Sequence, residues 1–297
     1  MNPEIDEPIS ARSHYVEVSG LRTHYLEGGE GPTLILLHDG GFGGSGAATW
    51  YRNFDAFASR FHVIAPDWLG FGRTAKVHDF EGGRARRLWH MTRFLEEIGV
   101  DAAAFAGVSM GATLLLQVLA SKEQDWPVQA AVAISGGGFM PNNAARQSMV
   151  GFDGTRESMR ALVRAMTLDP RWENDPNLLD RRLHDATQPG AWEAVAAARF
   201  KSPVAAEPEG FGGQDRTPYE DISVPTLLIA GADDALREPG YADDVARRVP
   251  HCELHVLSRC GHMANIEQAE QVNDLVLEFL VRTLNPGNEV LTRGATT

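Results

Sequence analysis

Short apolar runs recur along most of the chain, separated by stretches with helical periodicity. Residues 15–27 favour two short strands joined by a turn at Ser19-Gly20. Further apolar runs occupy residues 33–37, 62–65, 102–107, 128–135, 226–230 and 253–257. Continuous apolar runs of this length are typical of parallel strands that are buried on both faces of a sheet.

The stretches between these runs place apolar residues at helical spacing. The periodic sets are Trp50, Phe54 and Phe57; Leu88, Met91, Leu95 and Ile98; and Val272, Leu275, Val276 and Phe279. Each set predicts a helix with one face against the sheet. Alternation of strands and helices predicts an α/β protein with a mostly parallel, doubly wound sheet and helices on both faces.

One interval breaks this alternation, because no convincing strand lies between Gly136 and Tyr219. Helical stripes there include Met159–Met166, a set around Leu178, Leu179 and Leu183, and Ala191–Phe200. The sequence therefore predicts a core of residues 1–138 and 219–297 with a helical insertion at 139–218. A lid over the active site is the favoured interpretation of this insertion, and a structural appendage is the alternative.

Composition narrows the class of protein and its partners. The 297 residues are 43% hydrophobic and 23% charged, with a formal net charge of −13. This is ordinary for a globular protein, and the acidic balance disfavours nucleic acid and anionic membranes as partners. The acidic N-terminus lacks a signal-peptide core, and no stretch of about 18 apolar residues could span a membrane.

The two cysteines bear on the compartment. Cys252 and Cys260 flank a predicted strand, which would separate them by roughly 26 Å. A disulfide needs Cα atoms within about 7 Å, so we expect free thiols and a cytoplasmic protein. The expected partner is a small-molecule substrate, and the sequence is compatible with a homo-oligomer.

The segment Gly107-Val108-Ser109-Met110-Gly111 fits the pattern G-x-S-x-G. It follows an apolar run and precedes a helical one, which is the strand–turn–helix context of a nucleophile elbow. Such a turn exposes the serine Oγ and directs the positive end of the next helix at the site. The pattern predicts Ser109 as a nucleophile, which needs an acid and a base further along the chain.

Candidates for both follow the last two predicted strands. Asp233 and Asp234 come directly after residues 226–230, and the G-x-x-D spacing from Gly231 favours Asp234, with Asp233 as the alternative. His262 follows the run 253–257, after both the nucleophile and the acid. We therefore expect Ser109, Asp234 and His262 to form a catalytic triad, in which Asp234 orients the histidine.

The glycine-rich segment after residues 33–37 predicts an oxyanion hole. Glycines there let backbone N–H groups approach a ligand closely. We assign Gly40 as one donor, with Gly41 as the alternative, and the amide of Met110 as the other. Gly41–Gly46 also matches the dinucleotide fingerprint G-x-G-x-x-G, but that hypothesis leaves the serine, aspartate and histidine unexplained. We expect neither a cofactor nor a metal ion.

These motifs resemble the α/β-hydrolase superfamily over almost the whole chain. The closest resemblance is to the meta-cleavage product hydrolases, which hydrolyse carbon–carbon bonds in ring-opened aromatic compounds. The likeness rests on residues 38–46 with Trp50, on 63–67 leading to Gly70-Phe71-Gly72, on Ser109-Met110-Gly111, and on 254–262 continuing to Glu267. It implies the α/β-hydrolase fold, a helical lid and hydrolysis without a cofactor.

The resemblance also implies substrate-binding residues. The family carries a lid arginine that binds the substrate carboxylate, and Arg182 has a similar setting. Val108, Met263 and Phe42 are further candidates. The family typically has asparagine at the position of Val108, tryptophan at that of Met263, and glycine at that of Asp39. These departures predict a more apolar pocket than is usual in the family.

The leading functional hypothesis is therefore hydrolysis of a carbon–carbon bond in a ring-fission product. A carboxylesterase or lactonase with the same triad is the alternative, and cofactor-free haloperoxidase-like activity is a third. Ser109 excludes the related enzymes that need an aspartate nucleophile. A ligand-binding receptor with an idle triad belongs to a different class, and the presence of every triad residue disfavours it.

Overall fold

The computed structural model describes residues 10–80, 83–121, 125–197 and 212–284. Its centre is an eight-stranded sheet with the order β1-β2-β4-β3-β5-β6-β7-β8. The strands are β1 (Arg12–Val18), β2 (Leu21–Gly28), β3 (Thr33–Leu37), β4 (His62–Pro66), β5 (Ala103–Val108), β6 (Val128–Ile134), β7 (Thr226–Gly231) and β8 (Cys252–Leu257). Every strand predicted from the apolar runs is present, and the predicted α/β-hydrolase architecture is confirmed.

Strands β3 to β8 all run parallel to one another, and β2 is antiparallel to both of its neighbours, β1 and β4. The hairpin turns at Ser19 and Gly20, which have φ angles of 50° and 79°. Two successive positive φ values match the right-handed twist of paired strands, which explains the two-residue turn. All residues of β5 and β7 are buried, because helices cover both faces of the sheet at its centre.

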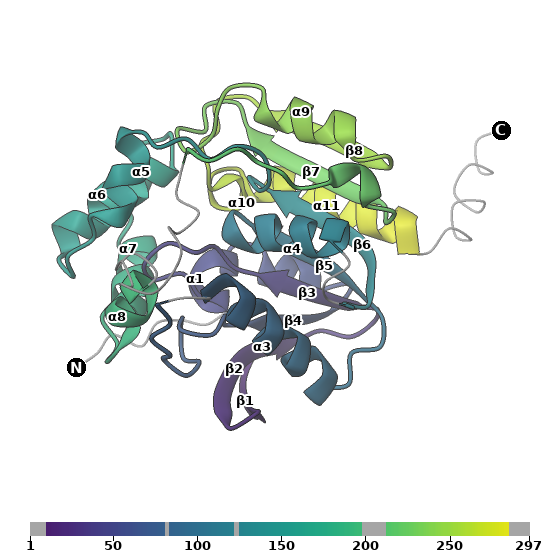
Figure 1. Ribbon diagram of the computed structural model, residues 1–297, viewed down its shortest axis with the longest axis horizontal. Helices are drawn as coiled ribbons and strands as arrows, with labels where there is room; N and C mark the ends of the chain where they lie inside the picture. The colour runs from purple at the N-terminus through teal and green to yellow at the C-terminus, as the bar shows by residue number, and fades with distance from the viewer. Residues whose placement is uncertain (1–9, 81–82, 122–124, 198–211, 285–297) are drawn as a thin grey trace.

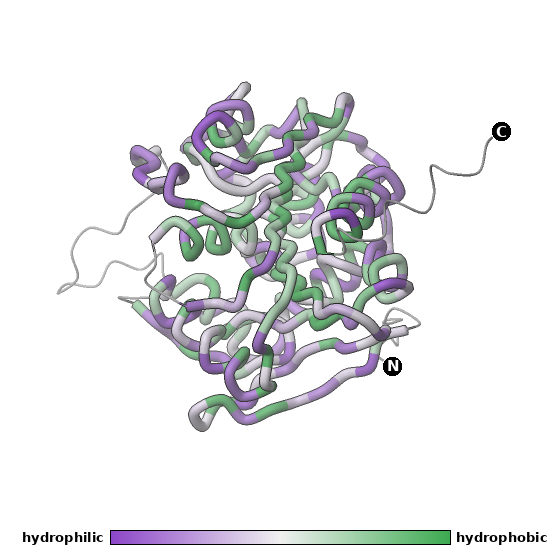
Figure 2. Tube along the Cα trace, turned by 90° about the vertical axis from the view of Figure 1, so that its right-hand side faces the viewer, coloured by the Kyte–Doolittle hydropathy of each residue, from purple (hydrophilic) through white to green (hydrophobic). Residues whose placement is uncertain are grey.

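The helices that cover the sheet pack through apolar faces. On one face lie α3 (Gly83–Glu97), α4 (Met110–Ser121) and α9 (Tyr241–Arg248), and on the other lies α11 (Ala269–Leu284), as Figure 1 shows. Helix α2 (Phe54–Ala58) contacts α11. Figure 2 shows apolar segments running through the middle of the molecule, with the polar segments mostly at the periphery. The catalytic candidates lie where strands of this core end.

The helix predicted around Trp50, Phe54 and Phe57 is broken into two. Helix α1 spans Gly46–Trp50, and α2 begins at Phe54. At the break, the buried Asn53 side chain donates hydrogen bonds to Asn265 O (3.0 Å) and Asn273 Oδ1 (2.7 Å). These contacts to residues far along the chain explain why helical periodicity alone misses the turn.

Between β6 and β7 the described residues form helices and no strand. They are α5 (Ala144–Val150), α6 (Arg156–Met166), the short η1 (Trp172–Asn174), α7 (Pro176–Ala186), α8 (Ala191–Ala196) and η3 (Tyr219–Asp221). The predicted helix of residues 191–200 ends at Ala196, and its last three residues lie outside the described part. Figure 1 shows α5 to α8 gathered at one side of the sheet, and α7 contacts α1.

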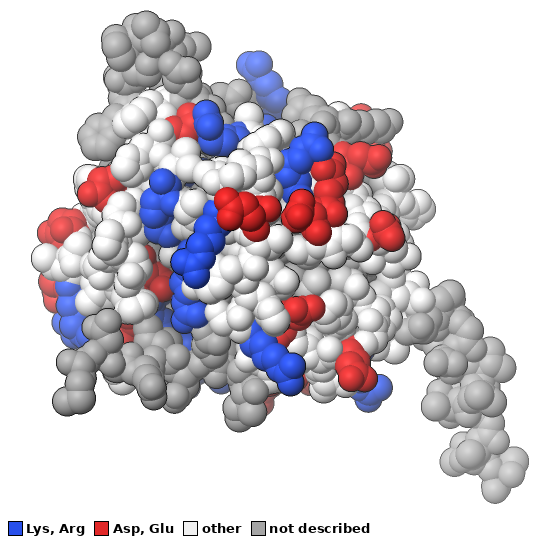
Figure 3. Space-filling view, turned by 90° about the horizontal axis from the view of Figure 1, so that it is seen from below, with Lys and Arg blue, Asp and Glu red and all other residues white. Residues whose placement is uncertain are grey.

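Charged side chains of both signs lie on the surface of the molecule. On the face shown in Figure 3, basic and acidic side chains are interspersed, with wide uncharged areas between them. None of the described helices has the length and apolar character needed to cross a membrane.

Cys252 and Cys260 are free, as the spacing predicts, and burial raises the pKa of the Cys260 thiol to about 12.

Candidate active site

Ser109 lies in a strained turn between β5 and α4. Its φ of 53° is in the left-handed region, which costs roughly 1–2 kcal/mol for a residue with a side chain. A Cβ atom on Gly107 would lie 2.5 Å from the amide of Ala112, and one on Gly111 would lie 2.4 Å from Leu37 O. Glycines are therefore required on both sides of this turn, and the half-buried serine is held at the amino end of α4.

The loop after β8 brings a histidine to this serine. His262 Nε2 lies 2.7 Å from Ser109 Oγ, and His262 Nδ1 lies 2.7 Å from Asp234 Oδ2. The other oxygen of Asp234 accepts a hydrogen bond from the Leu236 amide at 2.8 Å. Burial raises the pKa of this carboxyl, but His262, Arg237 and the amide outweigh it and hold the pKa below its usual value. With the imidazole proton on Nδ1, Nε2 is free to accept the serine proton.

The neighbouring Asp233 takes no part in this arrangement. It is exposed, and its amide donates to Cys260 O at 2.9 Å. The end of β7 lies against the histidine loop so closely that a Cβ on Gly231 would fall 2.0 Å from Gly261 O. The structure thus brings Ser109, His262 and Asp234 together and leaves Asp233 aside.

The glycine-rich loop after β3 approaches the start of α4. A Cβ on Gly40 would lie 2.6 Å from Met110 Sδ, so the backbone at Gly40 is next to the residue that follows the serine. The Gly41 amide already donates to Asp39 Oδ1 at 2.8 Å, whereas no described residue accepts a hydrogen bond from the Gly40 amide. This difference favours Gly40 over Gly41 as the donor partnered with Met110.

His38 holds the same loop from the other side. Trp68 donates its amide to His38 Nε2 at 2.9 Å, so Nδ1 carries the proton and donates to Asp39 O at 2.6 Å. Burial lowers the pKa of the imidazole, although nearby carboxylates oppose this. His38 is therefore neutral and fixed, and it positions the chain just before Gly40.

Arg182, from α7, forms a buried ion pair with Asp39 of this loop. Its two terminal amino groups donate to the Asp39 carboxylate at 2.9 and 3.0 Å, and one also donates to Phe42 O at 3.1 Å. Thr49 Oγ1 donates to the same carboxylate at 2.8 Å. Burial raises the pKa of Asp39, but the charge and hydrogen bonds of Arg182 and of the neighbouring groups outweigh it and hold the pKa far below its usual range.

The other predicted pocket residues are all buried. Val108 and Met263 belong to the apolar core, and the Met263 amide donates to Met166 O at 3.0 Å. Phe42 packs on Phe152 and Trp192, with ring centroids 4.9 and 6.3 Å apart. Their substrate-binding roles stay predictions. The sequence marked Asp39 only as a departure from the family, although a lone carboxylate inside an apolar, glycine-rich run already calls for a cationic partner.

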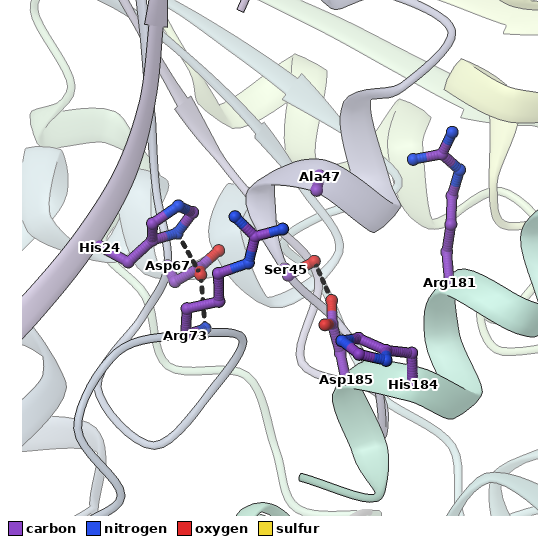
Figure 4. Close-up of a pocket in the computed structure, with 8 residues that line it drawn as sticks. All are labelled: His24, Ser45, Ala47, Asp67, Arg73, Arg181, His184 and Asp185. Atoms are coloured by element: carbon purple, nitrogen blue, oxygen red, sulfur yellow. Dashed lines mark hydrogen bonds and ion pairs between the residues drawn. The ribbon is translucent and has the colours of Figure 1, made fainter. Parts of the chain in front are cut away.

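A small cavity lies beside α7 (Figure 4), and none of Ser109, Asp234 and His262 lines it. Its lining residues are His24, Ser45, Ala47, Asp67, Arg73, Arg181, His184 and Asp185. Asp67 accepts from His24 Nδ1 at 2.7 Å, and Ser45 Oγ donates to Asp185 at 2.6 Å. Burial and the charge of Asp67 raise the pKa of Asp185 to about 6. Within the described ranges, no group of three or more His, Cys, Asp or Glu could hold a metal ion.

The chain is similar in sequence to known proteins over most of its length. The model of the alpha/beta hydrolase family matches residues 34–275. The chain is 30% identical over 284 residues to the 2-hydroxy-6-oxo-6-(2'-aminophenyl)hexa-2,4-dienoic acid hydrolase of Metapseudomonas resinovorans, covering 93% of this chain and 95% of that protein.

Solved structures extend the similarity to the fold. A meta-cleavage product hydrolase from Pseudomonas fluorescens IP01 superposes with a TM-score of 0.76 at 26% identity, covering 90% of this chain and 97% of that one. A carboxylesterase from Bacillus subtilis superposes with a TM-score of 0.72, also at 26% identity, covering 92% of each chain.

Proposed function

Because this chain is an enzyme of the alpha/beta hydrolase family, we propose that Ser109 is its nucleophile, His262 its general base and Asp234 the acid that orients the histidine. The observation that carries this proposal is the continuous hydrogen-bonded series from Ser109 Oγ through His262 to Asp234, with 2.7 Å at each step. The amides of Gly40 and Met110 stabilise the developing oxyanion.

In the proposed mechanism, side chains and amides of this chain supply the nucleophile, the base and the oxyanion donors, and water is the second reactant. As Ser109 Oγ attacks the substrate carbonyl, its proton passes to His262 Nε2, and Asp234 stabilises the imidazolium. Collapse of the tetrahedral intermediate expels the leaving group, which is neutralised by the proton from His262, and leaves an acyl group on the serine. Water then gives a proton to His262 as its oxygen attacks the acyl group, and His262 returns this proton to Ser109 Oγ as the bond to the serine breaks and the carboxylic acid leaves.

The leading substrate class is a ring-fission product in which a carbon–carbon bond is cleaved. It is supported by relatives at 27–30% identity over almost the whole chain, among them a 2-hydroxymuconate semialdehyde hydrolase of Pseudomonas putida. In this reaction the leaving group is a carbon atom. His262 first assists tautomerisation of the dienol, which moves a proton onto this carbon and creates a ketone that accepts the electron pair when the carbon–carbon bond breaks.

A small neutral ester or lactone is the second candidate, and one observation favours it. Both terminal amino groups of Arg182 are already bound to Asp39, and the side chain is about 1% exposed. A substrate carboxylate would have to displace Asp39 to use this arginine. An ester substrate makes no such demand.

One experiment tests both candidates. Purified protein and its Ser109→Ala variant are assayed against matched panels of acidic ring-fission products and neutral aryl esters. Turnover of the first panel supports the carbon–carbon hydrolase, and turnover of the second alone supports the esterase. Equal turnover by the wild type and the Ser109→Ala variant would refute the proposed triad.

A further inference from the structure

Glu267 is a buried carboxylate that the proposed mechanism does not use. It ends the short helix α10 (Ala264–Glu267), five residues after His262, and is 8% exposed. No cation of the described residues forms an ion pair with it. Instead, three backbone amides from two segments point at its two oxygens.

The first segment is the loop that carries the histidine. Glu267 Oε1 accepts a hydrogen bond from the Gly261 amide at 2.7 Å, next to His262. In the opposite direction, the Glu267 amide donates to Met263 O at 2.9 Å. The side chain and its own backbone therefore brace the loop on both sides of the histidine.

The second segment belongs to the helical insertion. Glu267 Oε2 accepts from the amides of Leu168, at 2.9 Å, and Asp169, at 3.1 Å, just after the end of α6. A Cβ on Gly261 would lie 2.7 Å from the Leu168 amide, so the two segments are in direct contact. Burial raises the pKa of Glu267, and the three amide donors oppose this rise. The ionised carboxylate suits amides on both sides, because it has two acceptor oxygens and no donor hydrogen.

We propose that Glu267 is a positioning residue that joins the His262 loop to the segment after α6, so that the helical insertion sets the position of the catalytic base. The inference rests on the proposed role of His262. It assigns the insertion a task besides the predicted one of covering the site, because the carboxylate fixes the loop that holds Nε2 of the histidine.

The test needs a probe that does not depend on the substrate. A fluorophosphonate serves, since Ser109 Oγ bonds to phosphorus, fluoride leaves and His262 takes the hydroxyl proton. The rate at saturating probe reports the chemistry, the half-saturating concentration reports binding, and the final extent of labelling reports the fraction of folded protein.

The decisive variant changes the insertion rather than the carboxylate. Leu168→Pro removes one amide donor, and Leu168→Ala is the matched control that keeps it. Leu168 is 43% exposed, and Thr167 has the extended backbone (φ −128°, ψ 150°) that a residue before proline adopts. A second pair is Glu267→Gln with the exposed control Glu270→Gln on α11.

We expect Leu168→Pro and Glu267→Gln to lower the saturating rate by about tenfold, the effect of losing one hydrogen bond to a charged group. Half-saturation should stay unchanged, and both controls should match the wild type. A lower extent of labelling with an unchanged rate would mean that Glu267 only stabilises the fold, and would overturn the inference. Failure to label the wild type would refute the proposed function itself, whereas equal rates in all four variants would refute only the role of Glu267.

Discussion

Asp39 and Arg182 are 143 residues apart in the chain, yet they form a bidentate ion pair with both side chains almost fully buried. One partner precedes the proposed oxyanion donor Gly40, and the other belongs to α7 of the helical insertion. The pair therefore connects the oxyanion loop to the insertion, as Glu267 connects the histidine loop to it. Both contacts make the insertion a part of the frame that holds the proposed site.

A double-mutant cycle measures this coupling. Arg182→Ala leaves a buried carboxylate without its partner, and Asp39→Ala leaves a buried guanidinium, so each should cost about 3–5 kcal/mol of stability. The double variant should cost less than the two single variants together, by about 1–3 kcal/mol. Urea unfolding of the four proteins gives the values. Additive costs, with a selective loss of turnover on acidic substrates in Arg182→Ala, would instead assign Arg182 to substrate binding.

Ser109→Ala should fold normally and lose nearly all turnover. Loss of the nucleophile from an interdependent triad costs about 10⁶ in kcat, while binding and the oxyanion hole leave a small residue of catalysis. Steady-state assays on the preferred substrate, with circular dichroism as the control for folding, check this. Retention of more than a few per cent of the activity would exclude Ser109 as the nucleophile.

The two aspartates after β7 should differ sharply. Asp234→Asn should lower kcat by about 10⁴, because the amide favours the wrong tautomer of His262. Asp233→Asn is the matched control, since this exposed neighbour only contributes its backbone amide. Both variants are compared by kcat on the same substrate. Small and equal losses would place the acid of the triad elsewhere.

Asp185→Asn should change how stability depends on pH. The pKa of Asp185 is raised to about 6 from the usual 3.8, so its ionisation destabilises the folded state as pH rises through this window. Below the window the carboxyl is neutral in both the folded and the unfolded chain, and the penalty vanishes. The variant can still accept the hydrogen bond of Ser45. Its free energy of unfolding, relative to that of the wild type, should rise by about 1 kcal/mol from pH 5 to pH 8.

Chemical denaturation at several pH values measures this difference. Asp67, Arg73 and His184 face the same cavity and remain unchanged in the variant (Figure 4). A stability difference that is constant from pH 5 to pH 8 would show that Asp185 does not ionise in this range.

The sheet could be predicted from the sequence because its strands are buried on both faces. Runs such as Thr33–Leu37 and the strand before Ser109 contain almost no polar residue, and β3 was predicted to the residue. The proposed triad could be located because each member follows a strand end, and parallel strands end at the same edge. Short stretches of the sequence are therefore enough to predict these strands and the positions of the proposed triad residues.

The features that the sequence could not predict depend on contacts between residues that are far apart in the chain. The turn at Asn53 depends on Asn265 and Asn273, more than 200 residues away, and the helical pattern around it continues without a break. The same holds for Asp39, which reads as an anomaly in a glycine-rich loop until Arg182 is placed beside it. The role of such a polar group depends on its partner in the folded structure, and no periodic pattern in the sequence predicts it.

The two adjacent central strands, β5 and β6, are each followed directly by a serine with φ of 53°, Ser109 and Ser135. Evolution by single substitutions is constrained at such a position, because glycine would relieve the backbone while removing the hydroxyl. Because Ser109 is the proposed nucleophile, selection for thermostability alone would favour glycine at residue 109 and a protein without the proposed activity. A laboratory library built from this chain should be screened for turnover and heat resistance together, since the most robust descendants would otherwise include those that have lost their chemistry.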